Sequence, residues 1–242
     1  MQNEAEITCD TLLRGRVKLL QPRRGFRSSL DPVLLAGFVA PPFGRFLDIG
    51  CASGALSFLL LAHDGAATGV GVEIQPRLAA LAEQGGVENG FVDRFRVITA
   101  DVRARGTVAG AAFDLVATNP PFRPIGTGVL SPLSEKALAN HEVSLALGEW
   151  LEVAALALRD GGRLATIFPF DRLDELRDEL AARGLRVTRF RSVVARSGDP
   201  PRRILLEASR SFGGQPVSEP PLIVHDQVGY SADVRRMLGE DA

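Results

Sequence analysis

Short apolar runs recur along the chain, and amphipathic stretches lie between several of them. The runs fall near residues 45–49, 68–73, 94–99, 112–118, 162–168, 185–194 and 203–208. Runs of this length bounded by turn residues are typical of buried strands, whereas apolar residues spaced three and four apart predict a helix. Their alternation predicts a Rossmann-like α/β fold, with a mostly parallel seven-stranded sheet and helices on both faces.

The helices can be placed from their end signals. Asp31 is read as an N-cap and Pro32 as the first residue of a short helix. A second helix is indicated by one apolar face, made of Val143, Leu147, Leu151, Ala154 and Leu158. Asp171 is read as the N-cap of a third helix, and Gly85 and Gly86 interrupt another at some energetic cost.

Length and composition bound the class of protein. The 242 residues suit one domain, in which we expect residues 1–44 to form a basic segment with a short helix and residues 45–242 to form the core. No apolar run reaches the length of a membrane span, and the polar start does not resemble a signal peptide, so we expect a cytoplasmic protein. Cys9 and Cys51 lie far apart, which argues against a disulfide framework and a metal cluster.

The net charge of −1 argues against binding nucleic acid by bulk charge, but the arginines are unevenly distributed. One basic stretch contains Arg14, Arg16, Lys18, Arg23, Arg24 and Arg27. A second zone contains Arg186, Arg189, Arg191, Arg196, Arg202 and Arg203. Most clusters of this kind are solvated faces.

Candidate chemistry lies at the ends of the predicted strands, where α/β sheets bind their ligands. The first strand ends in Asp48, followed by a turn that contains Gly50, Ala52 and Gly54. The glycines leave room for a ligand against bare backbone, the following helix N-terminus suits a carboxylate, and Asp48 accepts from a cationic group. An amino acid moiety fits this pairing better than a pyrophosphate does, although such a turn alone is more often a plain connection.

Two further acidic residues follow the next strands. Glu73 can accept both hydroxyls of a ribose, and Asp101 can accept from an adenine amino group. Each residue taken alone is an ordinary feature of a strand end.

The fourth strand is followed directly by Asn119-Pro120-Pro121-Phe122, residue types that suit a reaction at a poorly nucleophilic nitrogen. The lone pair of an adenine amino group or a carboxamide is delocalised, so the nitrogen is a poor nucleophile. The Asn119 side-chain oxygen and the Pro120 carbonyl can hold its two N–H bonds and localise that lone pair. Proline fixes the backbone, and Phe122 offers a face for a planar group. The motif predicts N-methylation, without a metal, of either an adenine or a carboxamide.

Together these segments resemble the class I methyltransferases and, among them, the tRNA1(Val) adenine-N6 methyltransferase family. The flanking segments that carry this resemblance are residues 25–36, 201–207, 221–226 and 230–231. The resemblance implies S-adenosylmethionine as cofactor, bound by residues 48–54, by Glu73 and Ile74, by Asp101 and Val102, and by Asn119. The chain departs from the family at Ala52, where glycine is usual, and at Phe122, where tyrosine is more frequent.

The resemblance also implies a substrate, the adenosine at position 37 in the anticodon loop of a valine tRNA. The basic segment then becomes a phosphate-contacting arm through Arg23 and Arg24, with Arg27 and Asp31 at the entrance for the base. Residues 123–140 would form a lid over the substrate, and His141 is read as a polar residue in the first turn of a helix, not as a catalytic one.

Two alternatives stay open. A protein glutamine methyltransferase of the release-factor type faces the same chemical problem, but such enzymes carry a substantial helical domain ahead of the cofactor fold. A non-catalytic RNA-binding protein of the same fold is favoured by Ala52, and the intact motif at 119–122 argues against it. The sequence does not indicate an oligomeric state.

Overall fold

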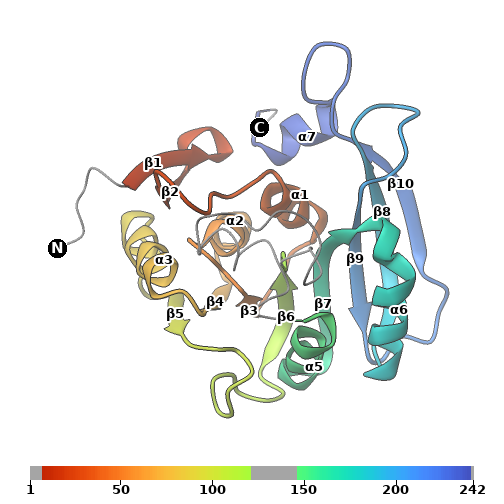
Figure 1. Cartoon of the computed structure of the whole chain (residues 1–242), viewed down its shortest axis with the longest axis horizontal. Coiled ribbons are helices and arrows are strands. Elements are labelled where there is room, and N and C mark those ends of the chain that lie inside the picture. The colour runs from red at the N-terminus through yellow and green to blue at the C-terminus, as the bar shows by residue number, and fades with distance from the viewer. Residues whose placement is uncertain (1–6, 121–145, 241–242) are drawn as a thin grey trace.

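A computed structural model describes residues 7–120 and 146–240 of the chain. Its main feature is an eight-stranded sheet with the strand order β10-β8-β9-β7-β6-β3-β4-β5 (Figure 1). These strands are β3 (Arg45–Ile49), β4 (Thr68–Glu73), β5 (Phe95–Thr99), β6 (Phe113–Thr118), β7 (Leu158–Pro169), β8 (Arg186–Val194), β9 (Arg203–Ser209) and β10 (Val217–Ile223). The fold is the expected mostly parallel α/β class, with one strand more than the seven that the sequence predicts.

The direction of the strands decides where the loops gather. β3, β4, β5, β6 and β7 run parallel, so their carboxyl ends share one edge of the sheet. β9 is antiparallel to both β7 and β8, with Arg203 in register with Pro169 at the end of β7. The loop that precedes β9 therefore lies at the same edge as the ends of the parallel strands.

Helices cover both faces of the sheet (Figure 1). α1 (Asp31–Phe38), α2 (Ala55–His63) and α7 (Ala232–Met237) share one apolar core, and α5 (Leu147–Ala157) and α6 (Leu173–Ala182) share the other. Successive strand residues alternate between the two cores: Phe46 belongs to the first and Leu47 to the second. None of the helices within the described ranges is long and apolar enough to cross a membrane.

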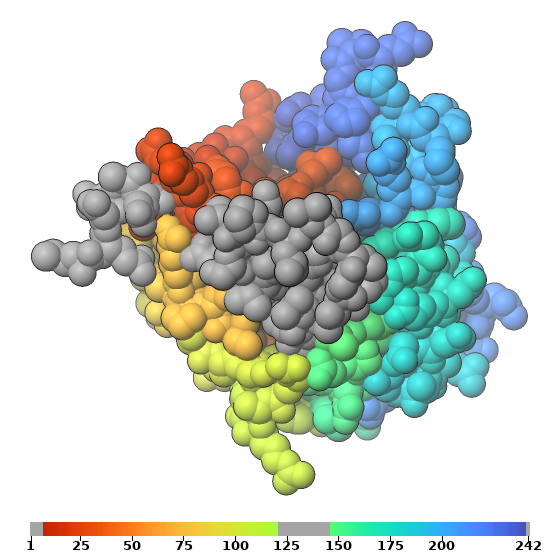
Figure 2. Space-filling model, viewed as in Figure 1, coloured from red at the N-terminus to blue at the C-terminus, as the bar shows by residue number. Residues whose placement is uncertain are grey.

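The N-terminal segment forms an antiparallel hairpin that the sequence analysis did not predict. β1 (Ile7–Leu12) pairs with β2 (Val17–Pro22) through a short 3-10 turn, Leu13–Gly15. The hairpin packs on α3 (Pro76–Glu88), where the Asn89 side chain accepts from the Lys18 N–H and donates to the Lys18 carbonyl, both at 2.8 Å. Figure 2 shows the hairpin and α3 next to each other on one face of the molecule.

Several predicted helix ends differ from the structure. Asp31 is not an N-cap but the first residue of α1, and its carboxylate pairs with Arg203. α6 begins at Leu173, after a 3-10 turn that contains Asp171. α5 ends at Ala157, so Leu158, which the sequence assigns to the apolar face of this helix, is already the first residue of β7, and Val143 lies outside the described residues.

Gly85 and Gly86 do not interrupt their helix. α3 runs through both, and an added Cβ at Gly85 would come within 2.8 Å of the Phe58 ring. The missing side chain therefore lets the helix approach the core closely, which offsets the low helix propensity of glycine.

Candidate active site

The candidate site residues at the strand ends meet at one edge of the sheet. Asp48 on β3 is in register with Gly71 on β4 and Ala117 on β6, and Glu73 on β4 is in register with Thr99 on β5. Because these strands are parallel neighbours, the structure brings together the segments that follow them. Asp48, Glu73, Asp101 and Asn119 therefore border the same region, as the sequence predicts.

The turn after β3 is held in an open conformation by its backbone. The N–H groups of Gly50 and Cys51 donate to the Val72 carbonyl at 2.9 and 3.1 Å. Gly50, Ala52 and Gly54 all have positive φ angles, of 72°, 50° and 90°. A Cβ at Gly50 would meet nothing within 4 Å, so the backbone leaves open space there. α2 begins directly after this turn, and its N-terminus is suited to a carboxylate.

Asp48 is a buried carboxyl group beside this turn. It is 1% exposed and accepts a hydrogen bond from Ser57 Oγ at 2.7 Å. Burial raises the pKa of Asp48 to about 7, and the nearby Glu73 carboxylate adds to the increase. No lysine or arginine in the described part of the chain forms an ion pair with Asp48. A cationic ligand would therefore stabilise its charged form.

Glu73 fixes the turn after β3 and remains able to bind a ligand. Its Oε2 accepts from the Ala52 N–H at 3.0 Å and its Oε1 from the Gln75 N–H at 2.8 Å. Burial raises the pKa of Glu73, and these backbone hydrogen bonds oppose the increase. Each carboxylate oxygen has a second lone pair, so the pair of oxygens can still accept from two hydroxyls. Ile74 beside it is 42% exposed and offers an apolar surface.

Gln75 is a further candidate contact in the structure that the sequence does not indicate. Its Oε1 is buried and accepts no hydrogen bond within the described residues. An unsatisfied buried acceptor next to Glu73 is a candidate contact for a ligand donor. No sequence signal marks this residue apart from its position two residues after Glu73.

Asp101 already has a partner in the protein. Its Oδ2 lies 2.6 Å from Arg103 Nη2, and Arg103 Nη1 lies 3.0 Å from Glu149 Oε1 at the start of α5. The hydrogen bond with Arg103 lowers the pKa of Asp101. An adenine amino group would use the remaining lone pairs of Asp101, so the adenine contact stays a prediction. Val102 is a core residue, 9% exposed.

The side-chain oxygen of Asn119 is a hydrogen-bond acceptor to which no group in the described residues donates. The preceding Thr118 donates through Oγ1 to the Ile49 carbonyl at 2.9 Å, which ties the end of β6 to the end of β3. The Asn119 Oδ1 atom is buried and accepts no hydrogen bond from any group in residues 7–120 and 146–240. Leaving a buried acceptor unsatisfied costs about 1–3 kcal/mol. Pro120 is buried beside it, while Pro121, Phe122, residues 123–140 and His141 lie outside the described residues.

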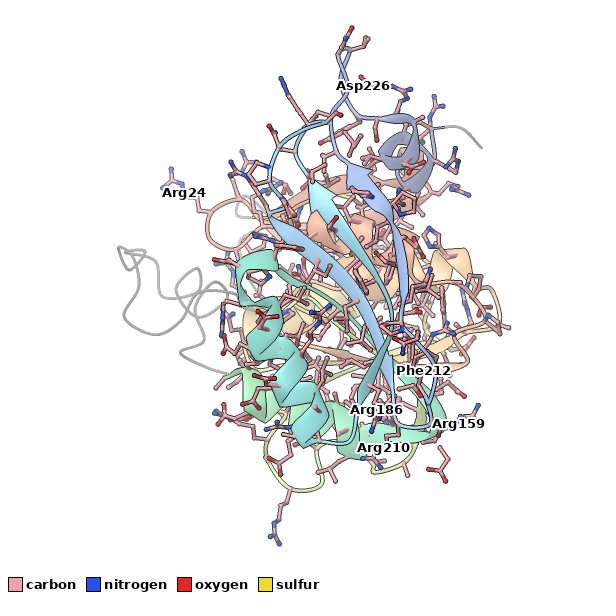
Figure 3. The ribbon with its side chains drawn as sticks, turned by 90° about the vertical axis from the view of Figure 1, so that its right-hand side faces the viewer. Arg24, Arg159, Arg186, Arg210, Phe212 and Asp226 are labelled. Atoms are coloured by element: carbon pink, nitrogen blue, oxygen red, sulfur yellow. The ribbon has the colours of Figure 1, made fainter. Side chains whose placement is uncertain are left out.

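The predicted substrate residues occupy different environments. Arg23 and Arg24 are exposed on the segment between β2 and α1, and Figure 3 shows Arg24 projecting away from the molecule. Arg27 donates to Thr8 Oγ1 at 2.7 Å and to the Pro22 carbonyl at 3.0 Å, and it pairs with Asp10. Arg27 thus binds its segment to the hairpin and is not paired with Asp31.

The polar groups at this edge fit S-adenosylmethionine. Asp48 and the N-terminus of α2 suit an ammonium and a carboxylate, and Glu73 suits two ribose hydroxyls. Among the described residues, no group of three His, Cys, Asp or Glu side chains is placed to hold a metal ion.

Comparison with known proteins supports this interpretation. A model of the family described as methyltransferase small domain matches residues 31–169. A protein of Porphyromonas gingivalis named tRNA1(Val) (adenine(37)-N6)-methyltransferase is 31% identical over 84% of this chain and 83% of its own length. A protein of Haemophilus influenzae with the same name is 27% identical over 85% of this chain and 84% of its own length.

Solved structures agree on the fold. The crystal structure of a predicted O-methyltransferase from Agrobacterium tumefaciens has a TM-score of 0.70 and 21% identity, over 88% of this chain and 97% of that one. The chain is a methyltransferase that uses S-adenosylmethionine, and it belongs to the methyltransferase small domain family, in the group of tRNA1(Val) (adenine(37)-N6)-methyltransferases.

Proposed function

We propose that the protein transfers a methyl group from S-adenosylmethionine to N6 of the adenosine at position 37 of a valine tRNA. The relatives carry this activity in their names. The observation that carries the chemistry is the buried Asn119 Oδ1, which lacks a donor in the described part of the chain. An exocyclic amino group supplies that donor.

The cofactor would be held by residues that are already arranged for it. Asp48 would accept from the ammonium, and the turn at Gly50, Ala52 and Gly54 would border the amino acid portion. Glu73 would accept from the ribose hydroxyls, and the Gln75 Oε1 is a further acceptor beside it. When bound, S-adenosylmethionine supplies a methyl group on a positively charged sulfur.

Asn119 and Pro120 would prepare the substrate nitrogen. The Asn119 Oδ1 and the Pro120 carbonyl would each accept one of the two N–H bonds, which localises the lone pair on nitrogen and directs it toward the methyl group. The tie between Thr118 and Ile49 fixes Asn119 relative to the cofactor turn, so the reacting atoms are aligned by rigid elements. After transfer, the positively charged nitrogen loses its extra proton to water.

The first experiment identifies the substrate. Tritiated S-adenosylmethionine should label undermodified total tRNA, and nucleoside analysis should show N6-methyladenosine. Label on release factor and not on tRNA would assign the same site to a carboxamide. No label on either, together with measurable cofactor binding, would indicate a binding protein without turnover.

The second experiment tests Asn119. Asn119→Ala should bind S-adenosylmethionine with nearly unchanged affinity but lower turnover by about 100-fold or more, the scale on which loss of one positioned hydrogen bond in a transition state acts. Calorimetry would measure binding, and single-turnover methylation would measure the rate. Near-normal turnover in this variant would contradict the proposed role. Thr188→Ala, at a half-buried position on β8 away from the site, is the control.

A further inference from the structure

The structure divides the second arginine-rich zone into two kinds of residue. Three of its arginines form ion pairs within the protein: Arg189 with Glu207 and Glu219, Arg191 with Asp233, and Arg203 with Asp31. The other three, Arg186, Arg196 and Arg202, are exposed and pair with no side chain in the described ranges. The exposed arginines are therefore free to bind a partner. Arg196 and Arg202 lie in the segment between β8 and β9, whereas Arg186 lies apart from them at the start of β8.

Arg202 lies at the edge of the sheet that carries the active site. It directly precedes β9, and its carbonyl accepts from the Phe170 N–H at 3.2 Å, just beyond the end of β7. β9 is separated from β6, which leads into Asn119, by β7 alone. Two strand spacings correspond to about 10 Å across the sheet. Arg202 is therefore close enough to the base-binding position to contact the backbone of a nucleotide bound there.

Arg196 shares this position because it belongs to the same loop. Residues 195–202 join β8 to β9, and they include Arg196 and Arg202 against one acidic residue, Asp199. The Asp199 carboxylate accepts from the Arg196 backbone N–H at 3.1 Å and so orders the loop. Asp226 is brought near this loop by the His225 N–H, which donates to the Ala195 carbonyl at 2.9 Å. Its carboxylate accepts from the Val228 and Gly229 N–H groups and pairs with Arg235, not with Arg196.

An ion pair connects this loop to the first basic segment. Asp31 follows the segment that holds Arg23 and Arg24, and Arg203 follows the 195–202 loop. Asp31 Oδ2 and Arg203 Nε lie 3.5 Å apart, although the two residues are far apart in the sequence. The pair thus anchors two exposed basic segments beside each other at the active-site edge.

We propose that the 195–202 loop is a second RNA-binding arm, in which Arg196 and Arg202 contact phosphates next to the methylated nucleotide. This inference rests on the proposed tRNA substrate and extends it. The arm through Arg23 and Arg24 and the 195–202 loop grip the RNA backbone together, while Asn119 holds the base. Neither loop arginine distinguishes one RNA sequence from another, because contacts to phosphates set the position and the affinity of the RNA but do not read its bases.

Arg186 provides a matched control. It is also exposed and unpaired within the described residues, but it begins β8, at the opposite edge of the sheet. Figure 3 shows Arg186 beside Arg210 at one end of the molecule and Arg24 toward the other. Replacing Arg186 removes the same charge from the same sheet without touching the proposed arm.

The test compares the affinity of the full-length protein for an unmodified valine tRNA transcript at several salt concentrations. Arg196→Ala with Arg202→Ala should reduce the magnitude of the slope of log affinity against log salt by about 1.4, because each phosphate contact contributes about 0.7 in single-stranded RNA. The variant should raise KM for tRNA while the affinity for S-adenosylmethionine stays unchanged. Arg186→Ala should match the wild type in slope and in KM.

The outcomes separate this inference from the proposed function. Normal methylation by the wild type with an unchanged salt slope in the double variant would overturn the second arm alone. An equal loss in Arg186→Ala would also overturn it, since charge at any position would then suffice. A wild-type protein that neither binds nor methylates tRNA would overturn both proposals.

Discussion

At the scale of single residues, the active site depends on carboxyl groups that burial keeps easily protonated. The pKa of Asp48 is raised to about 7 because the group is removed from water. Binding a cation requires the charged form, so the affinity for S-adenosylmethionine should fall by about tenfold for each pH unit below 7. Calorimetry at pH 6.0, 6.5, 7.0 and 7.5 would measure this and the accompanying proton release.

Two variants sharpen the Asp48 prediction. Asp48→Asn should bind more weakly, with no change of affinity between pH 6 and 7. Asp226→Asn, on an exposed turn that contributes nothing to the proposed cofactor site, should keep the pH dependence of the wild type. In the absence of cofactor, the raised pKa also means that Asp48 contributes stability below about pH 4, which is lost as the pH rises through 7. A wild-type affinity that is constant from pH 6 to 7 would contradict this assignment.

At Ala52, the family resemblance leads us to expect glycine, and the backbone at this position shows what alanine costs. Its φ of 50° lies in the left-handed region, where a side chain is strained by about 1 kcal/mol. Ala52→Gly should keep stability within about 1 kcal/mol of the wild type, because relief of strain and added freedom of the unfolded chain oppose each other. Ala52→Val should destabilise the protein by more than 1 kcal/mol, since a branched side chain fits this region worse.

Denaturant unfolding and cofactor titration check the Ala52 prediction together. Ala52→Gly should bind S-adenosylmethionine at least as tightly as the wild type, because the backbone N–H at position 52 is retained and still donates to Glu73. Equal stability of the glycine and valine variants would show that the backbone does not hold this conformation.

At the scale of elements, most of the sheet could be predicted because its strands are buried on both faces. β3, β4 and β6 are nearly continuous apolar segments bounded by turns, so their positions follow from the pattern. β10 was missed because Pro220 and Pro221 lie inside it. An edge strand tolerates prolines, and the register with β8 shifts at this point. The β1–β2 hairpin was missed because its arginines were read as a basic arm.

The types of residue in the candidate site could be predicted from the sequence, but the ion pairs that these residues form within the protein could not. Strand ends indicated Asp48, Glu73 and Asn119 as candidates, and the structure brings these positions together because parallel neighbouring strands end at the same edge. The sequence does not show that Arg103 forms an ion pair with Asp101, or that Arg27 forms one with Asp10 on the hairpin. These contacts depend on elements that only the fold brings together.

Close packing of α3 on α2 explains a glycine that looks unfavourable in sequence. An added Cβ at Gly85 would lie 2.8 Å from the Phe58 ring, and that ring is fully buried against Phe91 and Phe95. Gly85→Ala should therefore destabilise the protein by about 1–3 kcal/mol through overpacking, in spite of its better helix propensity. Gly86→Ala is the control, because its Cβ would lie 3.3 Å from Phe95 and needs only a small adjustment. Urea unfolding would show the contrast, and equal effects would contradict it.

At the scale of the whole molecule, a net charge of −1 is compatible with binding RNA because Arg196 and Arg202, which form no ion pair with the described residues, lie at the active-site edge. The paired arginines, such as Arg189 and Arg191, stabilise contacts between strands and helices. Charge left exposed at the active-site edge acts over a Debye length of about 8–10 Å at physiological salt. Local distribution therefore matters more for tRNA affinity than total charge.

The first basic segment supplies the last prediction. Arg23→Glu with Arg24→Glu should weaken binding of a valine tRNA transcript, most strongly at low salt, because two exposed charges without partners in the described residues are reversed. The variant should fold normally, since neither side chain packs in the core. Filter binding between 50 and 200 mM salt would measure the slope of log affinity against log salt, with Arg186→Glu as the control.

A combined variant tests whether the two basic segments act separately. If they contact separate phosphates, combining Arg23→Glu and Arg24→Glu with Arg202→Glu should add their losses in log affinity. A combined loss no greater than either alone would show that both segments contact the same phosphate. If Arg23→Glu with Arg24→Glu binds the transcript with the affinity of the wild type, the first basic segment is an ordinary solvated surface and does not bind RNA.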